Sequence, residues 1–150
     1  MTPLFLATAV EAALAAGRLQ RQHFRSPLAI EKKGAIDLVT EIDIRVEREF
    51  RALIAERFPD HAVLGEEGAA AGIETSASRH VWIIDPVDGT TNYAHGLALF
   101  CVSIALEIDG QTALGVVYDP MAEELFTAER GAGARLNGER IHVTDCPDLT

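Results

Sequence analysis

Carboxylates gather at three places in this sequence where an apolar segment ends or a helix is predicted to begin. They are Asp43, the pair Glu66 and Glu67, and Asp85 with Asp88. Hard cations such as Mg²⁺ prefer carboxylate, carbonyl and water oxygens, and a substrate phosphate commonly completes their coordination. The three clusters therefore predict a magnesium site that acts on a phosphorylated small molecule.

The segment Asp85 to Asn92 offers groups for both the cation and the phosphate. Pro86 fixes one backbone dihedral between the two aspartates, and such a bend can turn both carboxylates and the Val87 carbonyl to one side. Gly89 leaves room for a phosphate, and the amides of Gly89 and Thr90 point outward if a short helix begins there. Asp-Pro and Asp-Gly are also ordinary turn dipeptides, so a surface turn is the alternative. The buried strand predicted directly before the segment favours the site.

The other two acidic clusters also have plain structural interpretations. Glu66 and Glu67 lie between glycines and fit a solvated turn, and Asp43 fits a helix cap. Asp43 nevertheless shares a helical register with Val46 and Phe50, which places it at the edge of a buried helix face. A functional role for these carboxylates therefore depends on their meeting Asp85 and Asp88 in space.

Composition narrows the possible partners. The chain has 23 acidic and 13 basic residues, and its formal charge of -10 disfavours binding to nucleic acid. The five histidines are scattered, with His61 and His80 before strands, so zinc chemistry is not expected. Two distant cysteines, Cys101 and Cys146, fit reduced thiols in a cytoplasmic protein. No stretch is apolar for long enough to span a membrane, and the first residues lack the basic start of a signal peptide.

The elements expected to position these residues form an α+β fold. Thr2 and Pro3 begin a helix that reaches about His23, and a capping box of Thr40 with Asp43 begins a second helix that ends before Pro59. After that point the apolar period changes to two and predicts six strands: 62–64, 81–84, 100–108, 112–118, 124–128 and 140–143. Turn dipeptides between the later strands favour hairpins. We therefore expect one domain over residues 1–150, with two helices packed on an antiparallel sheet.

At this point the residues match a known family. The segment Trp82 to Tyr93, WIIDPVDGTTNY, resembles the first signature of the inositol monophosphatase family without a substitution. Further similarity occurs in the family's own order, and it covers nearly the whole chain: Lys32, 37–40 with Asp43, 65–67, 115–118 and 131–134. The resemblance implies the first half of a layered αβαβα sandwich, with a C-terminal α/β domain absent from these 150 residues.

The resemblance also implies which residues act. Glu66, Asp85 and the Val87 carbonyl would hold a first Mg²⁺, Asp85 and Asp88 a second, and a third ion would lie near Glu66. Asp88, Gly89 and Thr90 would hold the substrate phosphate. Asp43 and Thr90 would orient and deprotonate the attacking water, so Asp43, Thr90 and Glu66 are the expected catalytic residues.

The activity implied is Mg²⁺-dependent hydrolysis of inositol 1-phosphate by direct attack of water. A related sugar, histidinol or nucleotide 3′-phosphate is the alternative substrate. Inhibition by lithium and a homodimer are expected on the same basis. Because the family's second half supplies another metal-binding aspartate, the 150 residues alone are expected to bind Mg²⁺ weakly and to turn over slowly or not at all.

Two other classes of protein are alternatives, of which the first does not fit the spacing of the aspartates. Phosphatases of the haloacid dehalogenase type use two aspartates two residues apart, whereas Asp85 and Asp88 are three apart and a proline follows the first. A non-catalytic module that only binds metal or mediates dimerisation is the second alternative, because a fold does not guarantee its usual function.

Overall fold

The computed structural model describes residues 3–26, 30–32, 38–65 and 78–146 of the 150-residue chain. Their elements, in chain order, are α1 (Pro3–His23), β1 (Ile30–Lys32), β2 (Leu38–Thr40), α2 (Glu41–Arg57), β3 (Ala62–Gly65), β4 (His80–Asp88), α4 (Thr90–Ala94), β5 (Cys101–Ile108), β6 (Gln111–Asp119), β7 (Glu124–Glu129), β8 (Gly133–Leu136) and β9 (Glu139–Ile141).

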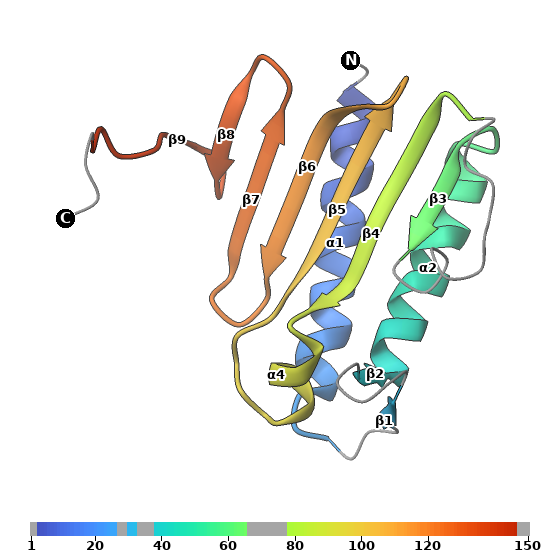
Figure 1. Ribbon diagram of the computed structural model, residues 1–150, viewed down its shortest axis with the longest axis vertical. Coiled ribbons are helices and arrows are strands. Elements are labelled where there is room, and N and C mark those ends of the chain that lie inside the picture. Colours follow the sequence, from blue (N-terminus) through green and yellow to red (C-terminus); the bar gives the residue numbers. More distant parts are fainter. Residues whose placement is uncertain (1–2, 27–29, 33–37, 66–77, 147–150) are drawn as a thin grey trace.

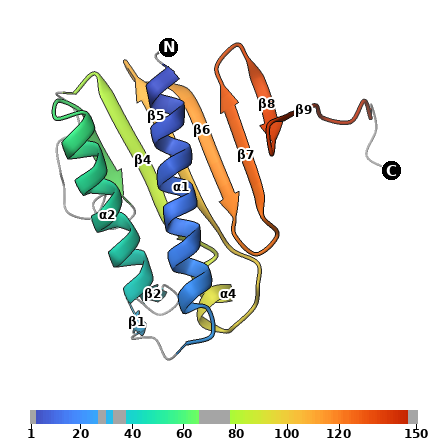
Figure 2. The same cartoon turned by 180° about the vertical axis from the view of Figure 1, so that it is seen from behind.

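Helices α1 and α2 lie side by side on one face of a seven-stranded sheet (Figures 1 and 2). They bury apolar stripes against β4, β5 and β6, and this interface is the hydrophobic core. Gly17 permits a close approach of α1 to the sheet, because a Cβ there would lie 2.4 Å from Cε1 of Tyr118 on β6. No helix among the described residues covers the opposite face of the sheet (Figure 1).

The strand order is β3-β4-β5-β6-β7-β8-β9, and β1 and β2 form a separate antiparallel pair. The predicted turn dipeptides do connect hairpins. Asp109 and Gly110 have φ of 52° and 71°, and Asn137 and Gly138 have φ of 49° and 86°. Two consecutive positive φ values are typical of the type I′ turn, whose twist matches that of the flanking strands.

The sequence predicted both long helices well. The expected end of the first helix at His23 is confirmed, although its cap at Thr2 lies outside the described residues. The capping box at the start of α2 is also confirmed, with Thr40 as N-cap and reciprocal bonds to Asp43. Pro59 follows the end of α2, as expected from a residue that cannot continue a helix.

The sheet differs from the prediction in three respects. It is mixed rather than antiparallel, because β3 pairs with β4 in parallel. A parallel pair needs a long connection, which the residues between β3 and β4 supply in length. Strand β4 continues to Asp88, beyond the predicted end at Ile84. The chain also adds the short strands β1, β2 and β8, which were not predicted.

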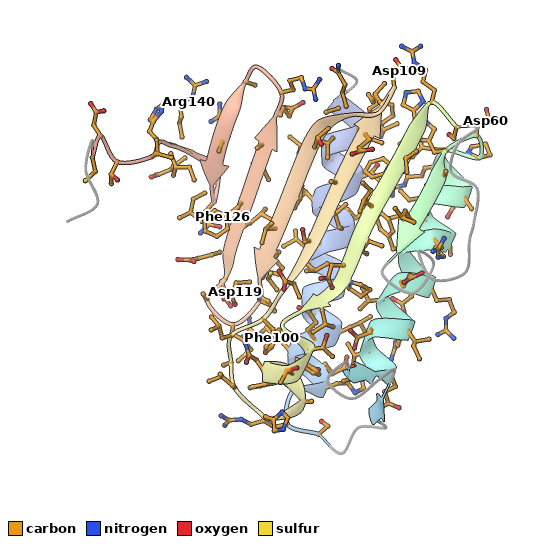
Figure 3. The ribbon with its side chains drawn as sticks, in the orientation of Figure 1. Asp60, Phe100, Asp109, Asp119, Phe126 and Arg140 are labelled. Atoms are coloured by element: carbon orange, nitrogen blue, oxygen red, sulfur yellow. The ribbon has the colours of Figure 1, made fainter. Side chains whose placement is uncertain are left out.

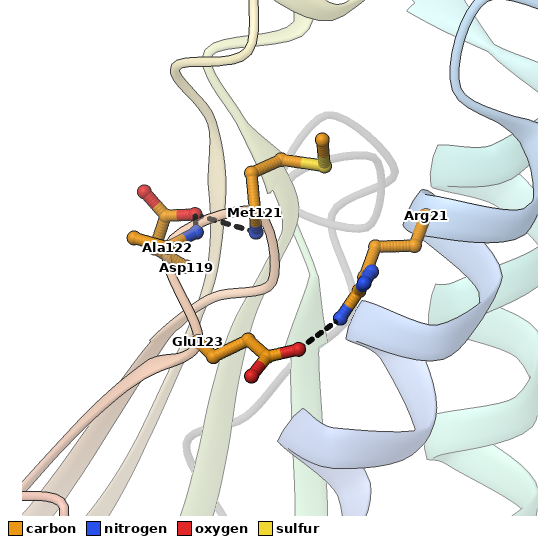
Figure 4. A network of polar contacts seen from close by, with 5 residues as sticks. All are labelled: Arg21, Asp119, Met121, Ala122 and Glu123. Carbon is orange, nitrogen blue, oxygen red and sulfur yellow. Dashed lines mark hydrogen bonds and ion pairs between the residues drawn. The ribbon is translucent and has the colours of Figure 1, made fainter.

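The two ends of the sheet carry different structures. Figure 3 shows Phe100 and Asp119 at the end where α4 lies, and Asp60 and Asp109 at the other. Close to the first end, Arg21 of α1 forms an ion pair of 2.6 Å with Glu123 in the turn between β6 and β7 (Figure 4). Asp119 accepts hydrogen bonds from the amides of Met121 and Ala122 in the same turn. Because the ion pair is exposed, it contributes less than about 1 kcal/mol to stability.

Candidate active site

The ends of two helices and one strand meet at one end of the sheet. They are the C-terminal end of α1, the N-terminal end of α2 and the C-terminal end of β4, which leads into α4 (Figure 1). Asp43 comes from the first turn of α2, and Asp85 and Asp88 come from the last residues of β4. The fold therefore brings two of the three predicted acidic clusters to the same end of the molecule.

An irregularity in β4 sets the direction of Asp85 and Asp88. Asp85 pairs with Ser103 and Asp88 with Cys101, so β4 advances three residues while β5 advances two. In a regular strand, residues three apart point to opposite faces. The β-bulge restores the phase, and both aspartates occupy positions on the same face of the sheet. The extra backbone is buried: Pro86 and Val87 are both buried next to the helices.

Gly89 makes the sharp change from strand to helix. It has φ of 95°, a left-handed backbone conformation that residues other than glycine adopt only at a cost in free energy. A Cβ at this position would lie 2.9 Å from the Leu99 carbonyl oxygen. Gly89 is also the N-cap residue of α4, which begins at Thr90, so the condition set for outward-pointing amides is met.

Asp43 is a buried carboxylate with a defined partner on each oxygen. Its side chain is 3% exposed. Oδ2 accepts bonds from the Thr40 amide at 2.9 Å and from the Thr40 hydroxyl at 2.5 Å, and Oδ1 lies 3.2 Å from the Thr90 hydroxyl. Burial raises the pKa of Asp43, and the bonds from Thr40 oppose that rise. A carboxyl group with a raised pKa is suited to accept a proton.

Thr90 connects Asp43 to the bulge. Its hydroxyl also lies 2.7 Å from the Val87 carbonyl oxygen, to which it can donate its single proton. The hydroxyl can therefore donate to either the Val87 carbonyl or the Asp43 carboxylate, but not to both at once. The structure thus brings together Asp43, Val87 and Thr90, which the family resemblance implied to share one site.

Two residues that brace this loop were not identified from the sequence. Gln20 of α1 is fully buried, and its Nε2 donates to the Pro86 carbonyl at 2.8 Å and to the Cys101 carbonyl at 3.4 Å. The hydroxyl of Tyr93, on α4, donates to the Gln20 carbonyl at 2.8 Å. A signal for Gln20 was present, because it is a polar residue in the helical register of Ala13 and Gly17 on the buried face.

Cys101 lies against one of the candidate metal ligands. Its Sγ is 3.7 Å from Oδ2 of Asp88. Burial, followed by the negative charge of Asp88, raises the pKa of the Cys101 thiol to about 12. The group is therefore a neutral thiol at physiological pH and not a nucleophilic thiolate.

The third acidic cluster lies outside the described residues, so the predicted roles of Glu66 and Glu67 remain predictions. Gly65, the last residue of β3, pairs with Ile84, which precedes Asp85 in β4. Within the described segments, no group of three or more His, Cys, Asp or Glu side chains forms a metal cluster.

The described groups nevertheless suit a hard cation. Asp85, the Val87 carbonyl and Asp88 supply oxygen donors only, and the bulge places both carboxylates on one face. Two of the histidines lie away from these groups, because His80 begins β4 at the opposite end of the strand. His61 and His80, expected to be apart, stack on each other with ring centroids 4.3 Å apart, and His61 accepts a bond from Trp82.

Comparison with known proteins decides the family. The sequence profile of the inositol monophosphatase family matches residues 4–150. The chain belongs to the inositol monophosphatase family. Enzymes of this family are generally metal-dependent, and the predicted family fold is confirmed as two N-terminal helices on a mixed sheet.

Individual relatives agree with this assignment. The chain is 45% identical over 146 residues to an inositol monophosphatase of Mesembryanthemum crystallinum, which covers 97% of the chain and 54% of that relative. It is 44% identical over 144 residues to the Nus factor SuhB of Escherichia coli strain K12, covering 94% and 53%. The chain therefore spans about half the length of the curated relatives that it matches.

Solved structures give the same result. The Thermotoga maritima IMPase superposes with a TM-score of 0.85 at 39% identity, covering 93% of this chain and 54% of that one. The extragenic suppressor protein suhB of Bartonella henselae superposes with a TM-score of 0.86 at 36% identity, covering 95% of this chain and 55% of that one.

In the described part of this chain, no helix is both long and apolar enough to cross a membrane.

Proposed function

We propose that this protein hydrolyses phosphate monoesters of the inositol 1-phosphate class with the help of Mg²⁺. The observation that supports the proposal most strongly is the bulge in β4, which puts Asp85 and Asp88 on one face of the sheet. The pair of Thr90 and Asp43 adjoins this bulge through the Val87 carbonyl. Oxygen donors for a cation, on β4, and a buried proton acceptor, on α2, thus lie at the same end of the sheet.

Four residues are proposed to hold the metal ions: Glu66, Asp85, Val87 through its carbonyl, and Asp88. Bound magnesium ions supply positive charge to the phosphate and lower the pKa of a water molecule. Their requirement follows from the protein's own charge, since a chain with a formal charge of -10 repels a phosphorylated substrate unless a cation intervenes.

The remaining chemistry is assigned to this chain's own side chains and backbone. Asp43 receives a proton from the attacking water through the Thr90 hydroxyl, and Glu66 is proposed to assist. Gly89 and Thr90 hold the phosphate beside Asp88. The chain needs glycine at position 89 on structural grounds as well, because a Cβ would lie 2.9 Å from the Leu99 carbonyl oxygen.

Several further properties are proposed from the family relationship. The substrate is an inositol phosphate, because relatives at 42 to 45% identity carry the name inositol monophosphatase. A homodimer, inhibition by lithium and a cytoplasmic location belong to the same proposal. The activity is assigned to the native-length protein, of which residues 1–150 form the N-terminal metal- and phosphate-binding domain.

The test combines binding and turnover in the native-length protein. Calorimetry with Mg²⁺ and a phosphate-release assay with inositol 1-phosphate would compare the wild type with Asp88→Asn. Because the substitution removes a charged ligand but keeps the shape, Mg²⁺ affinity and turnover should both fall at least tenfold. Asp109→Asn is the matched control, since Asp109 is exposed at the other end of the sheet. Equal Mg²⁺ binding by all three proteins would reject the proposal.

One relative supports a second candidate. The Escherichia coli protein at 44% identity is named a Nus factor and not a phosphatase, so a non-catalytic interaction module is the second candidate. A protein that binds Mg²⁺ normally but releases no phosphate from inositol 1-phosphate or from related sugar and nucleotide phosphates would favour this candidate over the first.

A further inference from the structure

Gln20 occupies a position where a packing residue would ordinarily be apolar. It lies in the last turns of α1, its side chain is 0% exposed, and its neighbours on the same face are Ala13 and Ala16. Its Oε1 is buried without a hydrogen-bond partner. A methionine or leucine would fill this volume without burying an unpaired acceptor. Burying the Gln20 amide therefore costs free energy that an apolar side chain would not. The bonds made by its other polar atom, Nε2, can offset that cost.

The Nε2 group of Gln20 forms its hydrogen bonds at the β-bulge of β4. A β-bulge interrupts the ladder of hydrogen bonds between two strands and leaves its extra residue unpaired. The interruption in this sheet lies between Asp85 and Asp88 on β4. Nε2 of Gln20 donates to the Pro86 carbonyl on β4 at 2.8 Å and to the Cys101 carbonyl on β5 at 3.4 Å. One amide group thus joins both strands at the point where their own ladder is irregular.

The backbone of the same residue holds the far end of the loop. The Gln20 carbonyl belongs to the last turn of α1, where helical carbonyls lack partners within the helix. It accepts the Tyr93 hydroxyl at 2.8 Å. Burial raises the pKa of Tyr93 to about 12, so this donor keeps its proton. The segment from Pro86 to Tyr93 is therefore fastened to a single residue of α1 at both of its ends.

We infer that Gln20 is a positioning residue that holds the β4 bulge, and with it Asp85 and Asp88, in the conformation that binds Mg²⁺. The inference rests on the proposed function, in which these carboxylates are metal ligands. The side-chain hydrogen bonds of Gln20 among the described residues go to the backbone carbonyls of Pro86 and Cys101 and not to the Asp85 or Asp88 carboxylate. Gln20 acts on the peptide group between them, because the carbonyl that it binds belongs to Pro86.

The experiment compares Gln20→Met with the wild type in the native-length protein. Methionine keeps the length and volume but cannot donate to the two carbonyls. Residues that orient metal ligands typically contribute 10- to 100-fold to metal affinity. We expect Mg²⁺ binding, measured calorimetrically, to weaken about tenfold, and amide hydrogen exchange at Val87 and Asp88 to accelerate.

Two further variants separate positioning from general stability. Ala13→Gly lies on the same face of α1 and weakens the helix without touching the loop, so it should leave Mg²⁺ affinity and exchange at Val87 unchanged. Gln20→Asn keeps the amide on an arm that is one methylene shorter, and it replaces Gln20→Met if that variant fails to fold. Like Gln20→Met, it should bind Mg²⁺ more weakly and exchange the Val87 amide faster than the wild type.

The outcomes distinguish the two proposals. Mg²⁺ affinity and loop exchange in Gln20→Met within twofold of the wild type would overturn the inference. Equal losses in Gln20→Met and Ala13→Gly would also overturn it, because they would reflect stability alone. If the wild type binds no Mg²⁺, the proposed function fails, together with the metal-binding part of the inference. The exchange comparison then decides separately whether Gln20 holds the bulge.

Discussion

The two ends of the sheet are built on different principles. At the end that carries the candidate site, buried polar groups are held by specific hydrogen bonds from Gln20, Thr40 and Tyr93, beside a smaller aromatic cluster of Phe24, Tyr93 and Phe100. At the opposite end, a continuous aromatic cluster fills the space between α1, α2 and the sheet; its members are Phe5, Phe50, Phe58, His61, His80 and Trp82.

The difference separates stability from chemistry. Each large aromatic side chain buries about 150–250 Å², and a well-placed aromatic pair adds about 0.5–1.5 kcal/mol. The carboxylate of Asp43, in contrast, is buried at a cost that raises its pKa. Substitutions in the aromatic cluster should therefore reduce stability, whereas substitutions at the site should reduce activity with little effect on stability.

The largest expected effect is that of Asp43→Asn on turnover. Asparagine has nearly the same shape but cannot accept a proton, and proton transfer to a positioned group contributes about 10²- to 10⁴-fold to a rate. Phosphate release by the native-length protein should fall by about that factor, while the free energy of unfolding at pH 7 stays within about 1 kcal/mol. Lost turnover together with a collapse in stability would show that Asp43 is only a helix cap.

Trp82→Ala should show the reverse behaviour. Trp82 is completely buried, and its ring packs against Phe50 and Phe58. Replacing a core tryptophan by alanine typically costs about 3–5 kcal/mol, which urea denaturation would measure. Trp82→Phe, the milder control, should lose less. Fully stable Trp82→Ala protein would break the division between the two ends.

Tyr93→Phe tests a single bond at the site. The substitution removes the donor to the Gln20 carbonyl and leaves the ring packed between Phe24 and Phe100. An unmade buried hydrogen bond of this kind costs about 1 kcal/mol. Chemical denaturation should detect that loss. A loss as large as that of Trp82→Ala would mean that the site end also carries the main stability of the fold.

The smallest effect is a pH dependence at the aromatic end. Burial lowers the pKa of His61 from its ordinary value of 6.5, and its Nδ1 accepts a bond from Trp82 at 2.9 Å. Since the folded state prefers the neutral ring, this contribution to stability is present above pH 6.5 and is lost as the pH falls through the folded pKa. His61→Asn should reduce the loss of unfolding free energy on acidification.

The exposed His142, outside the cluster, supplies the control for this measurement. His142→Asn should leave the pH dependence unchanged. Equal slopes in the wild type and in His61→Asn would show that protonation of this ring is not coupled to folding.

The sequence predicted most of the elements because their signals are local. The capping box of Thr40 and Asp43 lies within four residues, and the turn dipeptides at Asp109 and Asn137 set the hairpins by their own backbone preferences. Partners distant along the chain left no such signal. The parallel pairing of β3 with β4 and the stacking of His61 on His80 were therefore missed.

By itself, the sequence determined the residue types of the candidate site and their order, since WIIDPVDGTTNY already names two carboxylates, a glycine and a threonine. Only the tertiary structure decided to which face of the sheet the side chains of these residues point. The direction of Asp85 and Asp88 depends on a one-residue slip against β5, and the bulge that makes this slip is bound by Gln20, 66 residues away from Pro86. A side chain's face depends on register, and register is a property of paired strands.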